Sequence, residues 1–324
     1  MRLALVLLAA CGSNSPQTGV DAPQVHDGAG QPSDALASDG AAGDGASSDG
    51  STALTDPAGP GPYTVTTATV SIPAGGTRTA PATTYVPSSA APRPLVFVSP
   101  GFQMARTQYA SYAQHLASWG FTVVLADYTD TGFFADHQQL ADDIALEISW
   151  AIGQQNLGVD AAAIATAGHS LGGDLSMLVA ADDNRIKAVV GWDPVDGGNP
   201  AVLPKVPSIG AAIAVIGETT DGSGGFMPCA PTASNYQKFF AGAKPPAYEL
   251  NVPTADHMDW VDDPSCAACG LCTAGTASAE LARTATRRLN VAWLRTRFFN
   301  DSAMAPWLAA PPEVAAGTAT VATK

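Results

Sequence analysis

The stretch that decides the fold is Ala167-Gly168-His169-Ser170-Leu171-Gly172-Gly173. An apolar run over residues 162–167 precedes it, and a run that can form a helix, 174–181, follows it. Between a strand and a helix, Gly-x-Ser-x-Gly is typical of a sharp turn that exposes a serine hydroxyl above the edge of a sheet. We therefore predict that this serine is a nucleophile. The alternative is a glycine-rich turn without chemistry.

Apolar runs alternate with amphipathic segments on both sides of this turn. The segments with the composition of strands are 63–72, 83–86, 95–98, 121–126, 164–167, 186–190, 212–216 and 248–252. Such alternation predicts an α/β protein with a mostly parallel eight-stranded sheet covered by helices on both faces. With the serine after the fifth strand, the order is that of the α/β-hydrolase fold, which we expect over residues 61–305.

The N-terminus has the features of an export signal. Arg2 precedes the apolar run 3–10, which is too short to span a membrane as a mature helix. The peptide Leu8-Ala9-Ala10-Cys11 resembles a bacterial lipobox, in which the cysteine is lipidated after removal of residues 1–10. We therefore expect an exported bacterial lipoprotein, at the outer membrane or cell surface, that contacts the membrane only through Cys11. A plain signal peptide with a chance cysteine is the alternative.

The two ends of the chain differ in composition from its middle. Residues 11–60 are Gly, Ala, Ser, Asp and Pro with few large apolar residues, which predicts a disordered tether. Residues 306–324 are rich in Ala, Pro and Thr, and we expect a loose tail there. The chain has no internal repeat that would indicate a second domain, and we expect a monomer.

The charge distribution bounds the partners. The 324 residues carry a formal net charge of −14, and seven of the acidic residues lie between residues 12 and 60, where there is no Lys or Arg. Neither this segment nor the remainder has a basic cluster, so nucleic acid is not an expected partner.

A serine hydroxyl becomes a good nucleophile when a histidine takes its proton and a carboxylate orients that histidine. In this fold the chain order is serine, acid, histidine. Only His257 follows Ser170, so we predict that it is the base. The remaining histidines are His26, His115, His137 and His169, and we expect the last to point away from the serine.

Two aspartates could orient the imidazole of His257. Asp193 follows the apolar run 186–190, and Asp221 follows the run 212–216. Both therefore lie on loops at the carboxyl edge of the predicted sheet. The residues alone leave the two open as the acid.

The oxyanion of the reaction needs two backbone N–H groups. In this fold they come from the residue after the nucleophile, Leu171, and from the loop after the third strand, where Phe102 is the candidate. We expect the loop aromatics Phe102, Trp192 and Trp260 to line an apolar substrate pocket, with burial in the core as the alternative.

Four cysteines remain after Cys11, and export makes disulfides the default for them. The sequence leaves three pairings of the four cysteines open. We expect the bonds to connect the loop that carries His257 to the loop that carries Cys229. A structural zinc site is the alternative, although we predict neither a metal nor a cofactor. The four are Cys229, Cys266, Cys269 and Cys272.

Several peptides of this chain, in their order along the sequence, resemble those of chlorophyllases, a family of α/β-hydrolases. The resemblance implies hydrolysis of an ester and implies that the acid is the Asp of Asp-Pro-Val, which is Asp193. Chlorophyllases usually have Arg where this chain has Leu171. The similarity extends over residues 94–299, and it is carried by Gly168-His169-Ser170, Gly172-Gly173, Asp193-Pro194-Val195, Met227-Pro228-Cys229-Ala230-Pro231-Thr232, His257-Met258-Asp259 and Asp262-Asp263.

A second resemblance favours the other acid. The peptides at residues 99–102 (Ser-Pro-Gly-Phe) and 291–294 (Val-Ala-Trp-Leu) are similar to bacterial cutinases and polyester hydrolases. In those enzymes the acid follows the seventh strand, which implies Asp221. The same likeness implies that Phe102 clamps the substrate.

We therefore expect a serine esterase that cleaves hydrophobic carboxylic esters, small or polymeric, through an acyl-enzyme. One alternative is a cutinase-like polyester or lipid esterase that uses Asp221. The other is an inactive hydrolase fold that serves as a surface-binding lipoprotein.

Overall fold

The computed structural model describes residues 55–223, 228–264 and 269–324. The expected signal peptide, the lipidation site Cys11, most of the expected tether and Cys266 lie outside these residues. Among the described helices, none combines the length and the apolar character needed to cross a membrane.

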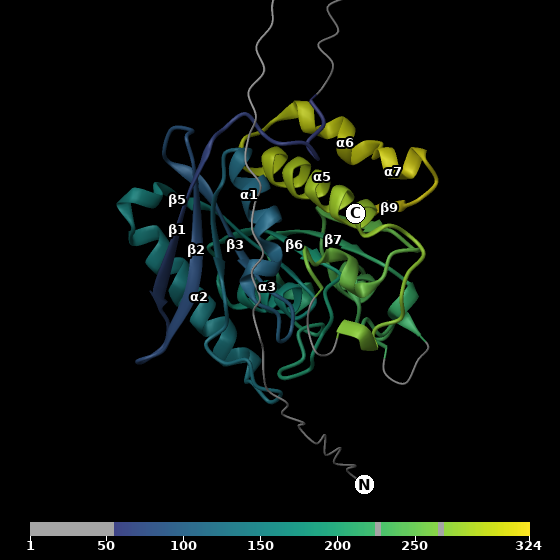
Figure 1. Ribbon diagram of the computed structural model, residues 1–324, viewed down its shortest axis with the longest axis horizontal. Helices are drawn as coiled ribbons and strands as arrows, with labels where there is room; N and C mark the ends of the chain where they lie inside the picture. The colour runs from purple at the N-terminus through teal and green to yellow at the C-terminus, as the bar shows by residue number, and fades with distance from the viewer. Residues whose placement is uncertain (1–54, 224–227, 265–268) are drawn as a thin grey trace, which may run out of the picture. The chain divides into compact units, whose positions relative to one another are not determined.

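The described strands form one sheet in the order β1-β2-β4-β3-β5-β6-β7-β8-β9 (Figure 1). Neighbours from β4 to β8 pair in parallel, whereas β1–β2, β2–β4 and β8–β9 pair antiparallel. The predicted α/β-hydrolase class is thus confirmed. The strands are β1 (Val65–Pro73), β2 (Thr79–Pro87), β3 (Arg93–Ser99), β4 (Thr122–Ala126), β5 (Val159–His169), β6 (Ile186–Trp192), β7 (Ala212–Gly217), β8 (Ala247–Asn251) and β9 (Thr320–Thr323).

Helices cover both faces of the sheet, because the central strands are apolar on both sides. On β3, Val96 and Val98 pack in one core with α1 and α5, while Leu95 and Phe97 pack in the other with α2, α3 and α4. The helices are α1 (Ala110–Ser118), α2 (His137–Gly153), α3 (Leu171–Asp182), α4 (Tyr236–Gly242), α5 (Ala279–Phe298), α6 (Ala305–Ala309) and α7 (Pro312–Ala315).

The C-terminal residues differ from the expected loose tail. They form α6, α7 and β9, and β9 adds a ninth strand beside β8 where the sequence predicted eight. The buried guanidinium of Arg288 on α5 pairs with the carboxylate of Glu313, which fixes this segment to the body of the fold. The elements are only four or five residues long, so they carry no apolar periodicity that the sequence could show.

The folded region also begins before residue 61, where the tether was expected to end. Asp56 pairs with Arg288 at 2.8 Å. The backbone oxygen of Gly59 accepts hydrogen bonds from Trp119 Nε1 at 2.9 Å and interacts with His115 Nε2 at 2.8 Å. These polar contacts tie residues 56–59 to α1 and α5, although the composition there matches the preceding residues.

Candidate active site

The turn at Ser170 joins β5 to α3 in the strained form that the motif predicts. Ser170 has φ 54° and ψ −117°, a conformation that non-glycine residues rarely adopt. A β-carbon at Gly172 would lie 2.1 Å from the backbone oxygen of Ser99, and one at Gly168 would lie 2.5 Å from the same atom. The two glycines therefore allow β3 and α3 to approach closely enough to hold the serine at the turn.

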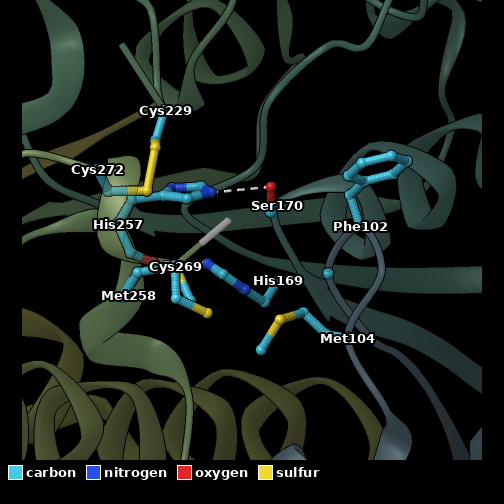
Figure 2. Close-up of a pocket in the computed structure, with 10 residues that line it drawn as sticks. Phe102, Met104, His169, Ser170, Cys229, His257, Met258, Cys269 and Cys272 are labelled. Carbon is cyan, nitrogen blue, oxygen red and sulfur yellow. Dashed lines mark hydrogen bonds between the residues drawn. A yellow bond between two sulfur atoms is a disulfide. The ribbon is translucent and has the colours of Figure 1, made fainter. Parts of the chain in front are cut away.

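Ser170, His257 and Asp193 form a continuous chain of hydrogen bonds. His257 Nε2 lies 2.9 Å from Ser170 Oγ (Figure 2), and His257 Nδ1 lies 2.6 Å from Asp193 Oδ2. The three residues follow β5, β8 and β6 respectively, so the fold brings them to the carboxyl edge of the sheet. This is the geometry in which a histidine can take a proton from a serine hydroxyl.

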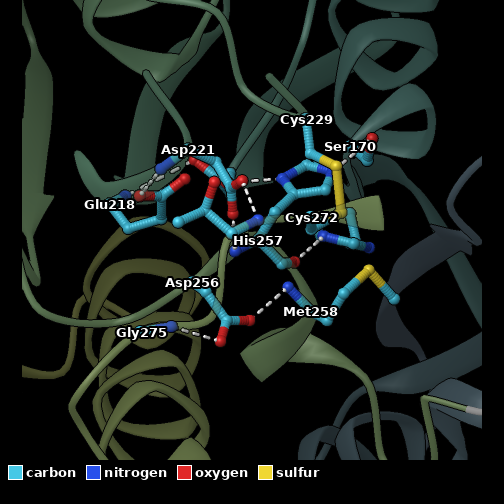
Figure 3. Close-up of a disulfide and its surroundings, with 12 residues drawn as sticks. Ser170, Glu218, Asp221, Cys229, Asp256, His257, Met258, Cys272 and Gly275 are labelled. Atoms are coloured by element: carbon cyan, nitrogen blue, oxygen red, sulfur yellow. Dashed lines mark hydrogen bonds and ion pairs between the residues drawn. A yellow bond between two sulfur atoms is a disulfide. The ribbon is translucent and has the colours of Figure 1, made fainter. Parts of the chain in front are cut away.

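Asp193, rather than Asp221, contacts the imidazole. Asp221 Oδ2 accepts a hydrogen bond from the backbone N–H of His257 at 3.1 Å, and its Oδ1 accepts one from Thr273 N at 2.6 Å (Figure 3). Asp221 therefore holds the backbone of the histidine loop. Burial raises the pKa of Asp193, and its hydrogen bond with His257 opposes that rise.

A second buried acid lies beside Asp193. The side chain of Glu218 is fully buried, and its Oε2 accepts a hydrogen bond from Asp221 N at 2.8 Å. Burial and the negative charge of Asp193 raise the pKa of Glu218 to about 9. This rise favours the neutral form of Glu218, which adds no second negative charge beside the imidazole.

His169 connects the base to the loop after β3. Its Nε2 lies 2.8 Å from the backbone oxygen of His257, and its Nδ1 lies 2.8 Å from the hydroxyl of Tyr109. That hydroxyl accepts a hydrogen bond from Gly101 N at 3.1 Å. Burial lowers the pKa of His169 well below its usual range. A neutral ring with its proton on Nε2 satisfies all these contacts, with Tyr109 donating to Nδ1.

The expectation that His169 points away from the serine is therefore incomplete. The ring lies 4.7 Å, between centroids, from the ring of His257, and it lines the same cavity. The sequence offered no signal for its role, because Tyr109 is 60 residues away and the acceptor on His257 is a backbone atom.

The two residues expected to form the oxyanion hole both adjoin the serine, since Leu171 follows it in the chain and Phe102 lines the same cavity. Leu171 is the first residue of α3, so its N–H has no acceptor within the helix. In the described part of the chain neither this N–H nor that of Phe102 donates to a backbone or side-chain acceptor. The assignment of Leu171 and Phe102 stays a prediction that this geometry permits.

A cavity of about 200 Å³ opens beside Ser170 (Figure 2). Its wall is largely apolar and rich in sulfur, which suits an uncharged ligand. It is lined by Gly101, Phe102, Met104, His169, Ser170, Cys229, His257, Met258, Cys269 and Cys272.

Trp192 and Trp260 do not line this cavity, so that prediction is wrong. The indole of Trp192 is fully buried, stacks on Tyr112 at 4.6 Å and donates to Asn290 Oδ1 at 2.9 Å. The indole of Trp260 is also fully buried and donates to Thr286 Oγ1 at 2.9 Å. Both side chains point into the core beneath α5. Trp192 is the last residue of β6, not a loop residue, and Trp260 ends the short helical turn that begins at His257.

A disulfide joins Cys229 to Cys272 and forms part of the cavity wall (Figure 3). The segment after Cys272 is also tied to the histidine loop by Asp256. Its Oδ1 accepts from Met258 N at 2.9 Å, and its Oδ2 accepts from Gly275 N at 2.7 Å. The expected connection between the loop of Cys229 and that of His257 is thus present. The disulfide joins Cys229 to Cys272, and the segment after Cys272 is hydrogen-bonded to the histidine loop.

Two groups of possible metal ligands occur among the described residues, with ligand atoms within 4.8 Å of one another. The first combines Asp221 with the sulfur atoms of Cys229 and Cys272, which are joined in the disulfide and offer no thiolate. The second combines Asp193, Glu218 and His257, whose carboxylate and imidazole already bond to each other. Most ligand atoms of both groups are thus engaged within the protein, whereas Glu218 Oε1 has no hydrogen-bond partner among the described residues.

Comparison with known proteins points to one family. The family model described as chlorophyllase matches residues 55–318. Chlorophyllase-1 of Arabidopsis thaliana is 29% identical over 206 residues, which cover 55% of this chain and 62% of that protein. Chlorophyllase-1, chloroplastic, of Citrus sinensis is 27% identical over 248 residues, 65% of this chain and 74% of that protein. The chain thus spans less than two thirds of the Arabidopsis relative. These matches support the first resemblance and not the one to cutinases.

Proposed function

This chain belongs to the chlorophyllase family of α/β-hydrolases, and from that premise we propose that it is a serine esterase for hydrophobic carboxylic esters. Family membership supports hydrolysis of an ester in general. The observation that carries the finer proposal is the chain of hydrogen bonds from Ser170 Oγ through His257 to Asp193, at 2.9 and 2.6 Å.

In the proposed reaction Ser170 Oγ attacks the ester carbonyl carbon while His257 Nε2 takes the hydroxyl proton. The resulting imidazolium is stabilised by Asp193. The oxyanion accepts hydrogen bonds from the N–H groups of Leu171 and Phe102. When the carbonyl re-forms, the bond to the alcohol oxygen breaks, and His257 gives its proton to the departing alcohol. A water molecule, deprotonated by His257, then attacks the acyl-serine, and the acid leaves as Ser170 regains its proton.

The hydrophobic character of the ester is inferred from the wall of the cavity. Phe102, Met104, Met258 and the disulfide surround the serine, while the described acids near it face the histidine or the protein backbone. A charged acyl group would lose its hydration there without gaining a partner. We propose the bond type and the apolar substrate, without assigning chlorophyll itself.

The test is hydrolysis of p-nitrophenyl esters of two, four, eight and ten acyl carbons by the purified chain. We expect turnover that Ser170→Ala lowers by at least about 10³-fold. The control is Ser71→Ala, at an exposed position of edge strand β1, which should retain full activity. Hydrolysis at the background rate by both the wild type and Ser170→Ala would contradict the proposal and leave the inactive, surface-binding alternative.

We also propose that the protein is exported and anchored through a lipid on Cys11. The support is the signal-like run 1–10 with its lipobox and the disulfide between Cys229 and Cys272, a bond typical of exported proteins. Cys11→Ala should move the protein from the membrane fraction to the soluble fraction. Retention of this variant in the membrane fraction would contradict the anchor.

A further inference from the structure

Seven large apolar side chains are exposed in the described part of the chain, and Phe102 among them lines the candidate site. Among the described residues they are Tyr63, Phe102, Phe133, Phe134, Leu146, Leu271 and Phe299. Phe133 is 75% exposed and Phe134 is 96% exposed, the highest values in this set. A phenylalanine left in water forgoes about 1.5–3 kcal/mol of burial free energy, so two adjacent ones indicate a contact made with a partner.

The protein presents these two side chains on an anchored turn. Gly132 N donates to Asp130 Oδ1 at 2.8 Å, and Ala135 N donates to Gly132 O at 3.2 Å, which places Phe133 and Phe134 at the tip. Ala135 itself is buried, and its backbone oxygen accepts from Asn199 Nδ2 at 3.2 Å. The exposure of the pair therefore follows from a built turn between β4 and α2.

The turn is continuous with the catalytic cavity. The ring of Phe133 meets that of Phe102 edge-on, with 5.4 Å between centroids and 63° between planes. Phe102 in turn lines the cavity beside Ser170. We call Phe102, Phe133 and Phe134 the aromatic rim.

The surface continues beyond the rim. Met104 lines the catalytic cavity and also a second hollow of about 370 Å³, whose other walls are Gln103, Ala105, Asp127 and Thr131. Cavities for drug-sized ligands usually measure about 300–1,000 Å³, so the 200 Å³ beside Ser170 holds only the part of a larger ester nearest the scissile bond. The remainder of such a substrate must lie on the surface outside.

We propose that the aromatic rim binds an uncharged aromatic group of the ester substrate, outside the catalytic cavity; this inference rests on the proposed esterase function. Aromatic rings favour edge-to-face and offset contacts at 4.5–7 Å, and the pair Phe102–Phe133 already uses this geometry. A third ring can join it in the same way. Asp130 and Asp136 flank the turn, so an anionic ring would be repelled.

The test compares esters that differ only in the saturation of one ring. Ethyl 4-phenylbutanoate is paired with ethyl 4-cyclohexylbutanoate, and benzyl acetate with cyclohexylmethyl acetate, so that both sides of the ester are sampled without a nitrophenyl group. The measured quantity is the ratio of kcat/KM for the aromatic ester to that for its saturated partner. Acid release at constant pH gives the rates.

In the double variant Phe133→Ala/Phe134→Ala we expect this ratio to fall at least about fivefold for one of the two pairs, mainly through KM. The control is Leu146→Ala, an exposed apolar residue on α2, which should keep the wild-type ratio. An unchanged ratio in the double variant would overturn the proposal, including the case in which both members of a pair lose activity equally. If the wild type hydrolyses none of these esters, nor the p-nitrophenyl series, the esterase function itself fails with it.

Discussion

The Nε2 atom of His169 lies 2.8 Å from the backbone oxygen of His257, so the residue before the candidate nucleophile supports the loop of the candidate base. Burial keeps the ring neutral by lowering its pKa. Through Tyr109 the same ring is connected to Gly101, the residue before Phe102. A change in this chain of hydrogen bonds would therefore alter the base and the oxyanion loop together.

Tyr109→Phe tests this connection, since it removes the hydroxyl that bonds Gly101 N and His169 Nδ1. We expect kcat for p-nitrophenyl butyrate to fall about tenfold with a smaller change in KM, because loss of a whole oxyanion donor costs about 10²–10³-fold. Tyr63→Phe, which removes a hydroxyl from an exposed ring, is the matched control. If kcat is unchanged while the melting temperature falls, the hydroxyl contributes to folding alone.

The two aspartates should separate clearly in kinetics. Asp193→Asn removes the charge that orients and stabilises the imidazole, and we expect kcat to fall by about 10⁴-fold. Asp221→Asn keeps an oxygen acceptor for the backbone of the histidine loop, so we expect a loss of less than about 10²-fold. The measurement is kcat of both variants with one p-nitrophenyl ester. A larger loss of kcat in Asp221→Asn than in Asp193→Asn would favour the cutinase-like alternative.

Glu147 on α2 predicts how stability depends on pH. Its side chain is buried, and burial together with the charge of Asp143 raises its pKa to about 8. Between pH 4.5 and 8 the folded protein then holds a proton that the unfolded chain releases, so this residue lowers stability as pH rises, by about 1.4 kcal/mol per pH unit.

Glu147→Gln carries no ionisable proton at this position. The free energy of unfolding in urea, measured for the variant minus the wild type, should therefore increase from about pH 5 to pH 8. Above pH 8 this difference should stay constant. Asp142→Asn, on the exposed face of the same helix, is the control. A constant difference between Glu147→Gln and the wild type across this range would show that Glu147 is ionised throughout.

The disulfide should stabilise both the fold and the site. Cys229 and Cys272 are 43 residues apart, and closing a loop of this length contributes about 4 kcal/mol in the chain-entropy account. In Cys229→Ser/Cys272→Ser we expect the free energy of unfolding to fall by about 2–4 kcal/mol. Activity at a temperature where the variant is folded should fall about tenfold, because the bond borders the histidine loop. Cys229→Ser alone should behave like the double variant. Wild-type stability in either variant would contradict the proposal that the disulfide stabilises the fold.

The central part of the fold could be predicted from the sequence because its signals are local. The apolar runs of β3, β4 and β7 are buried on both faces, and Gly168 and Gly172 are required by a turn that the motif itself describes. β9 could not be predicted, because four residues of Thr, Val and Ala form a strand only where β8 offers an edge.

The sequence predicted which residue types form the candidate site, but it predicted less well where their side chains point. Chain order selected Ser170 and His257, but the choice of Asp193 over Asp221 depended on a family resemblance until the distances were known. Trp192 was placed in the pocket from its loop position, whereas strand alternation turns its side chain into the core. The role of His169 depends on contacts that are distant in sequence.

The measurement that most directly tests the account is the intact mass of the protein after reaction with a fluorophosphonate probe, followed by peptide mapping. We predict one adduct, on Ser170, that forms rapidly in the wild type, is absent in Ser170→Ala and forms much more slowly in His257→Ala. An unmodified wild-type protein, or an adduct on any other residue, would contradict the proposal that this chain is a serine esterase.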